Sequence, residues 1–238
     1  MDTLYIVIPA YNEQDNIEEV IKDWYPVVDA QNDESRLVII DDGSKDDTYR
    51  VTCAAAQDRP KLIALTKPNG GHGATVLYGY NYALEHGADY VFQTDSDGQT
   101  LASEFGQFFE KRREYDMVIG HRKGRQDGLS RRFVTKTLKI VCRLCFGVTL
   151  TDANTPFRLM EAKVLYDNLK YVPKDFNLSN VILSVIYAKR GQKVKYIPIT
   201  FRPRQGGVNS INLKRIFKIG KQALKDFRTI NKQLKNIN

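Results

Sequence analysis

The stretch LYIVIPAYNEQDNIEEVIKDWY, residues 4–25, decides the fold of the N-terminal half. It opens with a short apolar run that ends at Pro9, a pattern typical of a buried strand. Apolar residues then recur three and four positions apart, from Ile17 through Val20 to Trp24, which predicts a helix. A short buried strand followed directly by a helix is the repeating unit of parallel α/β sheets.

The same alternation continues along the chain. Further strands are predicted at 36–40, 62–65, 89–94, 116–120 and 193–201. Helices are predicted up to residue 56 and at 74–86, 103–115, 129–146, 161–169 and 179–190, and residues 152–158 are expected to form a loop. We therefore expect an α/β fold with a Rossmann-like, mostly parallel central sheet and flanking helices.

Length and charge indicate one large domain with an appendage. The chain has 238 residues and a formal net charge of +8. Residues 212–238 contain eight Lys or Arg against one acid, so this tail carries +7 and residues 1–211 carry about +1. We expect a main domain over 1–211 and a basic amphipathic helix over 212–238. Because the positive charge is confined to the tail, we expect no nucleic-acid partner.

The tail repeats apolar residues at three- and four-residue steps with Lys and Arg between them. Such a helix can lie on an anionic membrane surface, or it can pack on the domain with a solvated basic face. No apolar stretch reaches the ~18 residues of a membrane span, and no secretory signal is visible. We expect a cytoplasmic protein, with peripheral contact at the inner face of the cell membrane as one reading of the tail.

The segment TDSDGQT, residues 94–100, follows a predicted buried strand. In an extended segment, alternate side chains share one face, so Asp95, Asp97 and Gln99 would converge. Oxygen ligands in this arrangement suit a hard divalent cation such as Mg²⁺ or Mn²⁺. The alternative is a polar turn, since Ser-Asp-Gly is also good turn chemistry.

Two other loops follow predicted strands. Asp41 and Asp42 open the turn DDGSKDDT, where a carboxylate can accept hydrogen bonds from a nucleobase or ribose; helix capping is the alternative, and it explains the later aspartates better. Gly70 and Gly73 lie in KPNGGHGA, whose backbone can approach a phosphate or form an ordinary loop. Because ligands of parallel α/β sheets bind at the carboxyl ends of the strands, these loops predict one shared site with Pro9 and Asp95.

Four ordered motifs resemble those of family 2 glycosyltransferases, and most closely the branch that transfers sugars to dolichyl or polyprenyl phosphate. They are VIPAYNE (7–13), DDGSKDDT (41–48), NGGHGA (69–74) and DSDGQ (95–99). The resemblance implies a GT-A catalytic domain over 1–211, an inverting mechanism, and a nucleotide-sugar donor held through Mg²⁺ or Mn²⁺. It places five residues in the nucleotide pocket: Pro9, Ala10, Tyr11, Glu13 and Asp41. It also implies that Asp95, Asp97 and Gln99 form the metal site, with Asp97 essential for catalysis.

The resemblance extends to the acceptor side. Arg131 begins a pattern similar to the branch's site for the acceptor phosphate, with Thr135 in place of serine, and Arg204 begins a loop of similar type. A phosphate acceptor is largely ionised at pH 7, whereas a hydroxyl acceptor needs a general base, for which Asp152 is the candidate. We expect transfer to a polyprenyl-phosphate or lipid-linked acceptor. The alternative is a saccharide or protein-linked glycan hydroxyl in polysaccharide or glycoprotein biosynthesis.

Two readings from other classes predict different features. A sugar-1-phosphate nucleotidyltransferase would carry a glycine-rich N-terminal loop with Arg and Lys, which is missing here. A nucleic-acid-binding protein would spread its positive charge along a groove. The pair Cys142 and Cys145 lies in a predicted apolar helix, where packing is the favoured role.

Overall fold

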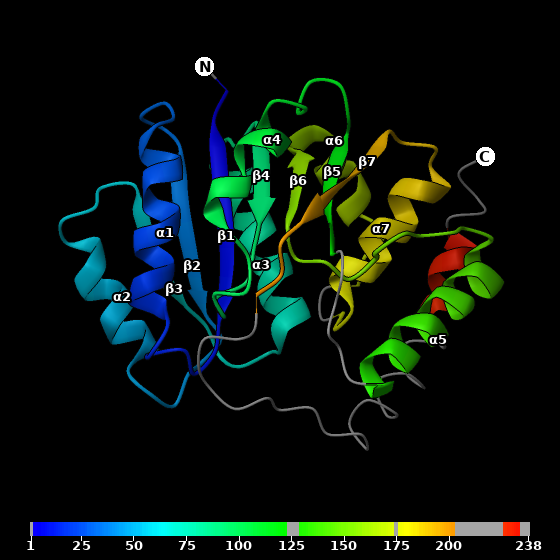
Figure 1. The fold of residues 1–238 in the computed structure, drawn as a ribbon, viewed down its shortest axis with the longest axis horizontal. Helices are drawn as coiled ribbons and strands as arrows, with labels where there is room; N and C mark the ends of the chain where they lie inside the picture. Colours follow the sequence, from blue (N-terminus) through cyan, green and yellow to red (C-terminus); the bar gives the residue numbers. More distant parts are fainter. Residues whose placement is uncertain (1, 123–128, 174–175, 203–225, 234–238) are drawn as a thin grey trace.

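The computed structural model describes residues 2–122, 129–173, 176–202 and 226–233, with only the backbone over 129–136. Its centre is a seven-stranded sheet in the order β3-β2-β1-β4-β6-β5-β7 (Figure 1). The strands are β1 (Leu4–Ala10), β2 (Arg36–Asp41), β3 (Leu62–Thr66), β4 (Tyr90–Gln93), β5 (Met117–Arg122), β6 (Arg158–Glu161) and β7 (Val194–Ile199). The helices are α1 (Ile17–Asp29), α2 (Thr48–Ala56), α3 (His72–Glu85), α4 (Gly106–Phe109), α5 (Leu129–Phe146), α6 (Ala162–Leu169) and α7 (Ser179–Lys189), with a 3₁₀ turn η1 (Ala102–Glu104). The α/β prediction is confirmed.

The sheet is parallel except at one strand. β1 pairs in parallel with β2 and β4, β2 with β3, and β5 with β7. β6 is inserted between β4 and β5 and runs antiparallel to both. The sequence analysis did not predict β6, because four residues between a loop and a helix give too short a pattern to distinguish.

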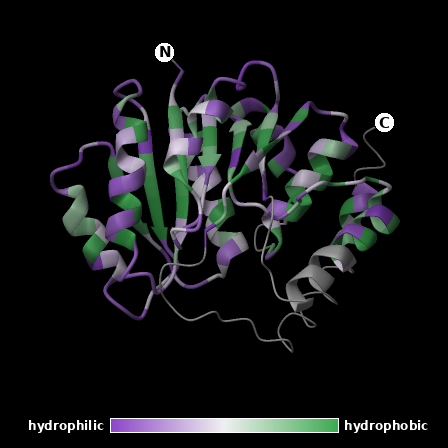
Figure 2. Ribbon diagram, viewed as in Figure 1, coloured by the Kyte–Doolittle hydropathy of each residue, from purple (hydrophilic) through white to green (hydrophobic). Residues whose placement is uncertain are grey.

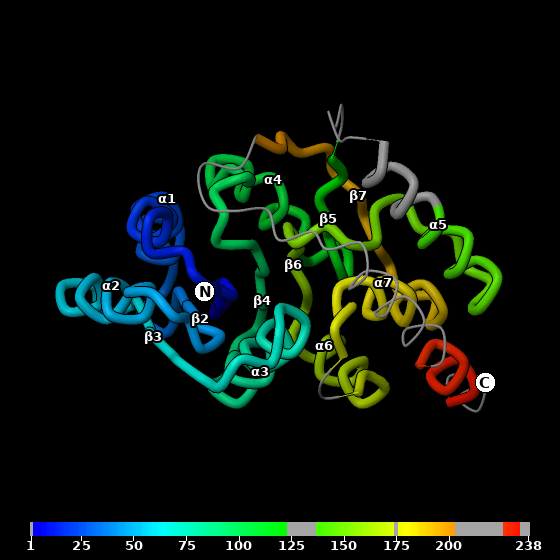
Figure 3. Tube along the Cα trace, turned by 90° about the horizontal axis from the view of Figure 1, so that it is seen from below, coloured from blue at the N-terminus to red at the C-terminus, as the bar shows by residue number. Residues whose placement is uncertain are grey.

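Alternate strand residues build two separate cores, one on each face of the sheet. Odd-numbered positions of β1, such as Tyr5 and Val7, pack with α3, α5 and α7. Even-numbered positions, such as Ile6 and Ile8, pack with α1 and α4. Figure 2 shows the apolar strands at the centre, and Figure 3 shows α1 and α4 on the face opposite α3 and α6. This period of two is what a sheet covered on both faces requires.

The predicted helix over 103–115 is wrong. The segment forms only η1 and the single turn α4, and residues 110–114 continue as turns. Gly106 is a poor helix residue, and Arg112 folds back so that its guanidinium lies 4.0 Å from the Phe109 ring centroid and 2.8 Å from Asp2. Arg112 thus combines a local contact with Phe109 and a distant one with Asp2 in the turns that follow α4.

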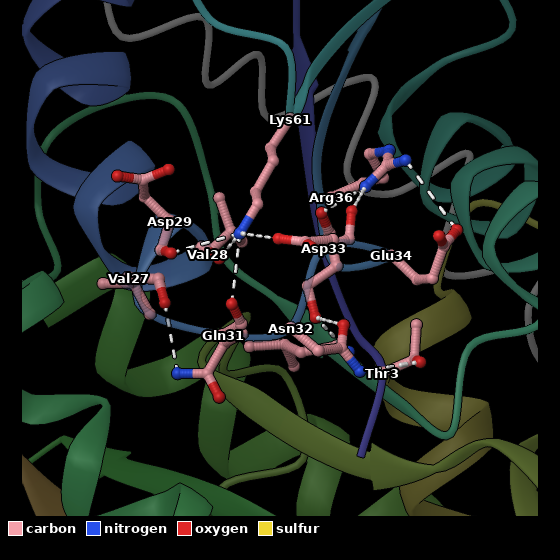
Figure 4. A network of polar contacts seen from close by, with 12 residues as sticks. Thr3, Val27, Val28, Asp29, Gln31, Asn32, Asp33, Glu34, Arg36 and Lys61 are labelled. Carbon is pink, nitrogen blue, oxygen red and sulfur yellow. Dashed lines mark hydrogen bonds and ion pairs between the residues drawn. The ribbon is translucent and has the colours of Figure 1, made fainter. Parts of the chain in front are cut away.

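A polar network fixes the amino ends of the strands (Figure 4). The Nζ atom of Lys61 donates to the carbonyl oxygens of Asp29 and Gln31, both at 3.1 Å, where α1 ends. A cation at this position satisfies terminal carbonyls and interacts favourably with the helix dipole. Asn32 joins the same connection to Thr3, just before β1, at 3.1 Å.

The described part of the C-terminal tail, 226–233, is helical and packs on the domain. Phe227 and Ile230 are buried, and the Phe227 ring lies 5.2 Å from Phe146 and 6.0 Å from Phe176. The packing alternative therefore applies to these residues, while 212–225 and 234–238 lie outside the described residues. Across the described ranges, no helix combines the length and apolarity needed to cross a membrane.

Candidate active site

Loops from four parallel strands meet at the carboxyl edge of the sheet. After β1, the backbone N–H of Asn12 donates to Ser44 Oγ at 2.9 Å, and Asn12 Oδ1 accepts from the N–H of Lys45 at 2.8 Å. Asn12 has a positive φ of 54°, a conformation that asparagine tolerates better than most residues. These bonds join the loop after β1 to the loop after β2.

Asp41, the last residue of β2, is buried beneath this edge. Its carboxylate accepts hydrogen bonds from the N–H of Ser44 at 3.2 Å and from Thr66 Oγ1 at 2.8 Å. Asp41 therefore organises the loop after β2 against β3. Its predicted contact with a nucleotide stays a prediction.

Asp42 holds the glycine loop. The backbone N–H groups of Gly70 and Gly71 each donate to its carboxylate at 2.8 Å, and Lys67 forms an ion pair with it. Burial raises the pKa of Asp42, but the hydrogen bonds from Lys67, Gly70 and Thr75 outweigh it, so the pKa lies below its usual value. Of the two glycines predicted near a phosphate, Gly70 thus has its N–H already bonded to Asp42.

Gly73 is a packing residue. A Cβ atom at this position would lie 2.2 Å from the carbonyl oxygen of Phe176 and 2.6 Å from that of Asn177. Only glycine allows α3 to approach the segment before α7 this closely. The glycine motif therefore also joins the loops at the carboxyl edge of the sheet to the second half of the chain.

The predicted metal residues lie where β4 ends. Asp95, Asp97 and Gln99 are partly exposed, whereas Thr94, Ser96 and Thr100 are buried. The segment is not extended: residues 96–98 form a bend, Gly98 has a φ of 67°, and Asp97 Oδ1 accepts from the Gln99 N–H at 3.1 Å, so the polar-turn alternative applies. Asp95 Oδ1 lies 2.9 Å from His72 Nε2, the first residue of α3. Removal of water by the surrounding protein disfavours the charged imidazolium and lowers the pKa of His72. The negative charges of Asp95, Asp97 and Asp42 raise this pKa by more, so the net shift is upward.

Two partly exposed carboxylates fit a divalent cation that also binds a diphosphate. Among the described residues, no group of three or more His, Cys, Asp and Glu side chains is placed to hold a metal. Mg²⁺ sites commonly use one or two carboxylates and complete their shell with substrate phosphates and water. The donor set of Asp95 and Asp97 is of this kind.

Gln99 connects the β4 loop to the segment after β7. Its Nε2 donates to the carbonyl oxygen of Arg202 at 2.9 Å, and the Arg202 N–H donates to the Gln99 carbonyl at 2.8 Å. Gln99 is thus observed to hold Arg202, which precedes Arg204 by two residues in the sequence. Its role as a metal ligand stays a prediction.

Asp152 is engaged in a buried ion pair. Arg122 donates through Nε to Oδ2 at 2.9 Å and through Nη2 to Oδ1 at 2.8 Å, and both side chains are buried. Bidentate pairs of this geometry are among the stronger polar contacts in proteins. Acceptance of a proton by Asp152 would require breaking this pair, which argues against a role as general base.

Arg158 is a site residue that the sequence analysis missed. Its fully buried guanidinium donates to the carbonyl oxygens of Thr155 at 2.6 Å, Ala153 at 3.2 Å and Asn180 at 3.0 Å. It therefore fixes the loop after Asp152 to the first turn of α7. The only signal in the sequence was its position at the end of DANTPFR.

The remaining predicted residues fall into two groups. Pro9 and Ala10 lie buried at the end of β1, Tyr11 is exposed, and Glu13 is buried and accepts a hydrogen bond from Asn16 at 2.7 Å. Arg131 lies in α5, but its side chain is not described, and Arg204 lies outside the described residues.

Fold and strand-end site together define a GT-A domain. Solved structures of glucosyl-3-phosphoglycerate synthase from Mycobacterium tuberculosis share this fold. The complex with Mn²⁺, UDP-glucose and glycerol 3-phosphate has a TM-score of 0.72 and 18% identity, covering 96% of this chain and 80% of that one. The complex with Mn²⁺, UDP and glucosyl-3-phosphoglycerate has a TM-score of 0.71, with the same identity and coverage.

The chain belongs to the glycosyl transferase family 2, whose family model matches residues 5–178. Among curated proteins it is similar to the undecaprenyl-phosphate 4-deoxy-4-formamido-L-arabinose transferase of Edwardsiella ictaluri, with 25% identity over 224 residues. The Klebsiella pneumoniae protein of the same name is 24% identical over 223 residues. In both cases the match covers 90% of this chain and 64% of the relative, so the chain spans less than two thirds of their length.

Proposed function

We propose that this chain transfers a sugar from a UDP- or GDP-sugar to a polyprenyl-phosphate or lipid-linked acceptor, with inversion at the anomeric carbon. The observation that carries the proposal is the convergence of the Asp41–Asp42 turn, the glycine loop and the Asp95–Asp97 pair at one sheet edge. Family membership supports the transfer of a sugar. The names of the relatives support an undecaprenyl-phosphate acceptor.

The described residues at the donor side would have different roles. Asp95 and Asp97 would hold Mg²⁺ or Mn²⁺, which would neutralise the charge that develops on the leaving nucleoside diphosphate. The loops after β1 and β2 would bind the nucleoside. Tyr11 would offer these loops' exposed aromatic side chain, and Asp41 is buried beneath them. Asp42 fixes the glycine loop by accepting hydrogen bonds from two of its N–H groups.

The ion pair of Asp152 supports a phosphate acceptor. A hydroxyl acceptor needs a base to remove its proton, and the carboxylate proposed for that task is held by Arg122. A phosphate monoester is mostly ionised at neutral pH and needs no such base. Arg131 and Arg204 would contact that phosphate. Transfer to a saccharide or protein-linked glycan hydroxyl is the second candidate.

Location and domain limits complete the proposal. We propose a GT-A catalytic domain over 1–211 and a basic C-terminal helix over 212–238, acting on the cytoplasmic face of the membrane. Peripheral contact would bring the domain to a lipid-linked acceptor.

Two experiments test the function. Thermal stabilisation by UDP- and GDP-sugars, with and without Mn²⁺, should identify the donor. Transfer is then measured with undecaprenyl phosphate in detergent and with saccharide acceptors. Activity on saccharides alone would overturn the lipid-phosphate proposal.

The metal assignment is tested by Asp97→Ala, with the exposed Asp58→Ala as control. We expect Asp97→Ala to abolish transfer while the circular dichroism spectrum is unchanged, and Asp58→Ala to retain wild-type activity. A fully active Asp97→Ala enzyme that does not require metal would contradict the assignment.

A further inference from the structure

Helix α5 exposes a pair of large apolar side chains. Ile140 is 50% exposed and Leu144 is 80% exposed, and the two lie four residues apart on one face of the helix. The opposite face packs inward through Cys142 and Phe146, which are buried. Figures 1 and 3 place α5 at the rim of the molecule, where its outer face looks away from the sheet.

The same face is strongly basic. Lys139 and Arg143 are exposed, and each precedes one of the apolar residues. Between residues 129 and 151 the sequence contains five Lys or Arg and no Asp or Glu. Exposed apolar side chains next to cations, on a helix that itself has no acids, are typical of helices that lie in the interface of an anionic bilayer.

The C-terminal helix, residues 226–233, packs against α5. Phe227 and Ile230 are buried against the domain, and Asn231 Nδ2 donates to the carbonyl oxygen of Cys145 at 2.7 Å. These two apolar residues of the tail are therefore not available to lipid. Arg228 and Lys232 of the same helix are exposed and add positive charge.

We propose that the outer face of α5, comprising Lys139, Ile140, Arg143 and Leu144, docks on an anionic lipid bilayer. A second copy of this chain is disfavoured because it would bring two helices without acids together, five cations against five. A nucleic acid would leave Ile140 and Leu144 without an apolar partner. The docking proposal concerns only contact with the membrane. A benefit for binding a lipid-linked acceptor, through Arg131 on the same helix, rests on the proposed function.

Co-sedimentation of the full chain with vesicles tests the proposal. Equimolar phosphatidylglycerol and phosphatidylethanolamine vesicles serve as the anionic surface, and phosphatidylcholine vesicles serve as the neutral one. We expect Ile140→Ser with Leu144→Ser to weaken anionic binding by at least about tenfold. The matched control is Tyr166→Ser on α6, whose side chain is 58% exposed, and it should bind like the wild type.

Charge reversal gives an independent variant. Lys139→Glu with Arg143→Glu should lose binding to the same extent, whereas Lys163→Glu with Lys193→Glu, two exposed lysines elsewhere, should lose much less. Circular dichroism confirms folding of each variant. Added salt should weaken wild-type binding.

Several outcomes would overturn the proposal. They are an absence of wild-type binding to anionic vesicles, equal binding to phosphatidylcholine, or unchanged binding by both α5 variants. An α5-dependent dimer or RNA complex without vesicle binding would also overturn it. Transfer to undecaprenyl phosphate in detergent is measured separately. An absence of transfer by the wild-type protein would refute the proposed function, whereas vesicle binding tests the docking surface alone.

Discussion

Gln99 and Arg202 exchange two hydrogen bonds across 103 residues of sequence, at 2.9 Å from the Gln99 side chain and 2.8 Å between backbone groups. This pair joins the loop that carries Asp95 and Asp97 to the segment that leads to Arg204. The proposed donor and acceptor sides of the site are therefore connected through one side-chain bond and one backbone bond of Gln99.

Gln99→Ala should impair acceptor use more than donor use. Loss of the side-chain bond costs about 1 kcal/mol, so we expect the acceptor KM to rise roughly fivefold while the donor KM changes less. Steady-state kinetics with each substrate varied in turn measures this, with the exposed Gln107→Ala as control. A large change in the Mn²⁺ requirement instead would identify Gln99 as a metal ligand.

Gly73→Ala should destabilise the fold. Its Cβ would lie 2.2 Å from the Phe176 carbonyl oxygen, so α3 and the segment before α7 must separate, at a cost of about 1–3 kcal/mol. A Cβ on Gly106 would meet no atom within 4 Å, so Gly106→Ala is the matched control and should be nearly neutral. Urea denaturation compares the two. Equal stabilities would show that the close approach is not required.

Asp42 should make stability depend on pH in the acidic range. Because its pKa is lowered on folding, its contribution is complete above the unfolded value of about 3.9 and is lost as the pH falls through the folded value. We expect Asp42→Asn to lower the Tm at neutral pH and to flatten the fall in Tm below about pH 4. The exposed Asp15→Asn should leave the Tm profile near that of the wild type. An identical acid limb in Asp42→Asn would contradict the prediction.

The Arg122–Asp152 pair should behave as a structural unit. Asp152→Ala leaves the buried guanidinium without this partner and should cost about 3–5 kcal/mol. Adding Arg122→Met should recover part of that loss, which a double-mutant cycle in urea measures. If Asp152 were the general base, Asp152→Asn would remain folded and lose at least about 100-fold in kcat on the accepted substrate.

The parts of the site that could be predicted from the sequence are those that depend on local order. The run of β1 into α1 and the Ser-Asp-Gly turn in TDSDGQT are local, and the structure has both. The predicted helix over 103–115 is wrong, and in the structure Arg112 of that segment binds Asp2, a partner 110 residues earlier that no local pattern shows. β6 was not predicted because its pairing with β4 and β5 exists only in the assembled sheet.

The sequence by itself determined the α/β class, the strand-end position of the acidic and glycine motifs, and the family, because periodicity and ordered motifs need no knowledge of distant contacts. Only the tertiary structure decided what several polar groups do. Asp42 binds the glycine loop, Asp152 binds Arg122, and Gln99 binds Arg202. Each of these partners lies at least 28 residues away, and a buried or half-buried polar group takes whichever partner the fold brings within hydrogen-bonding distance.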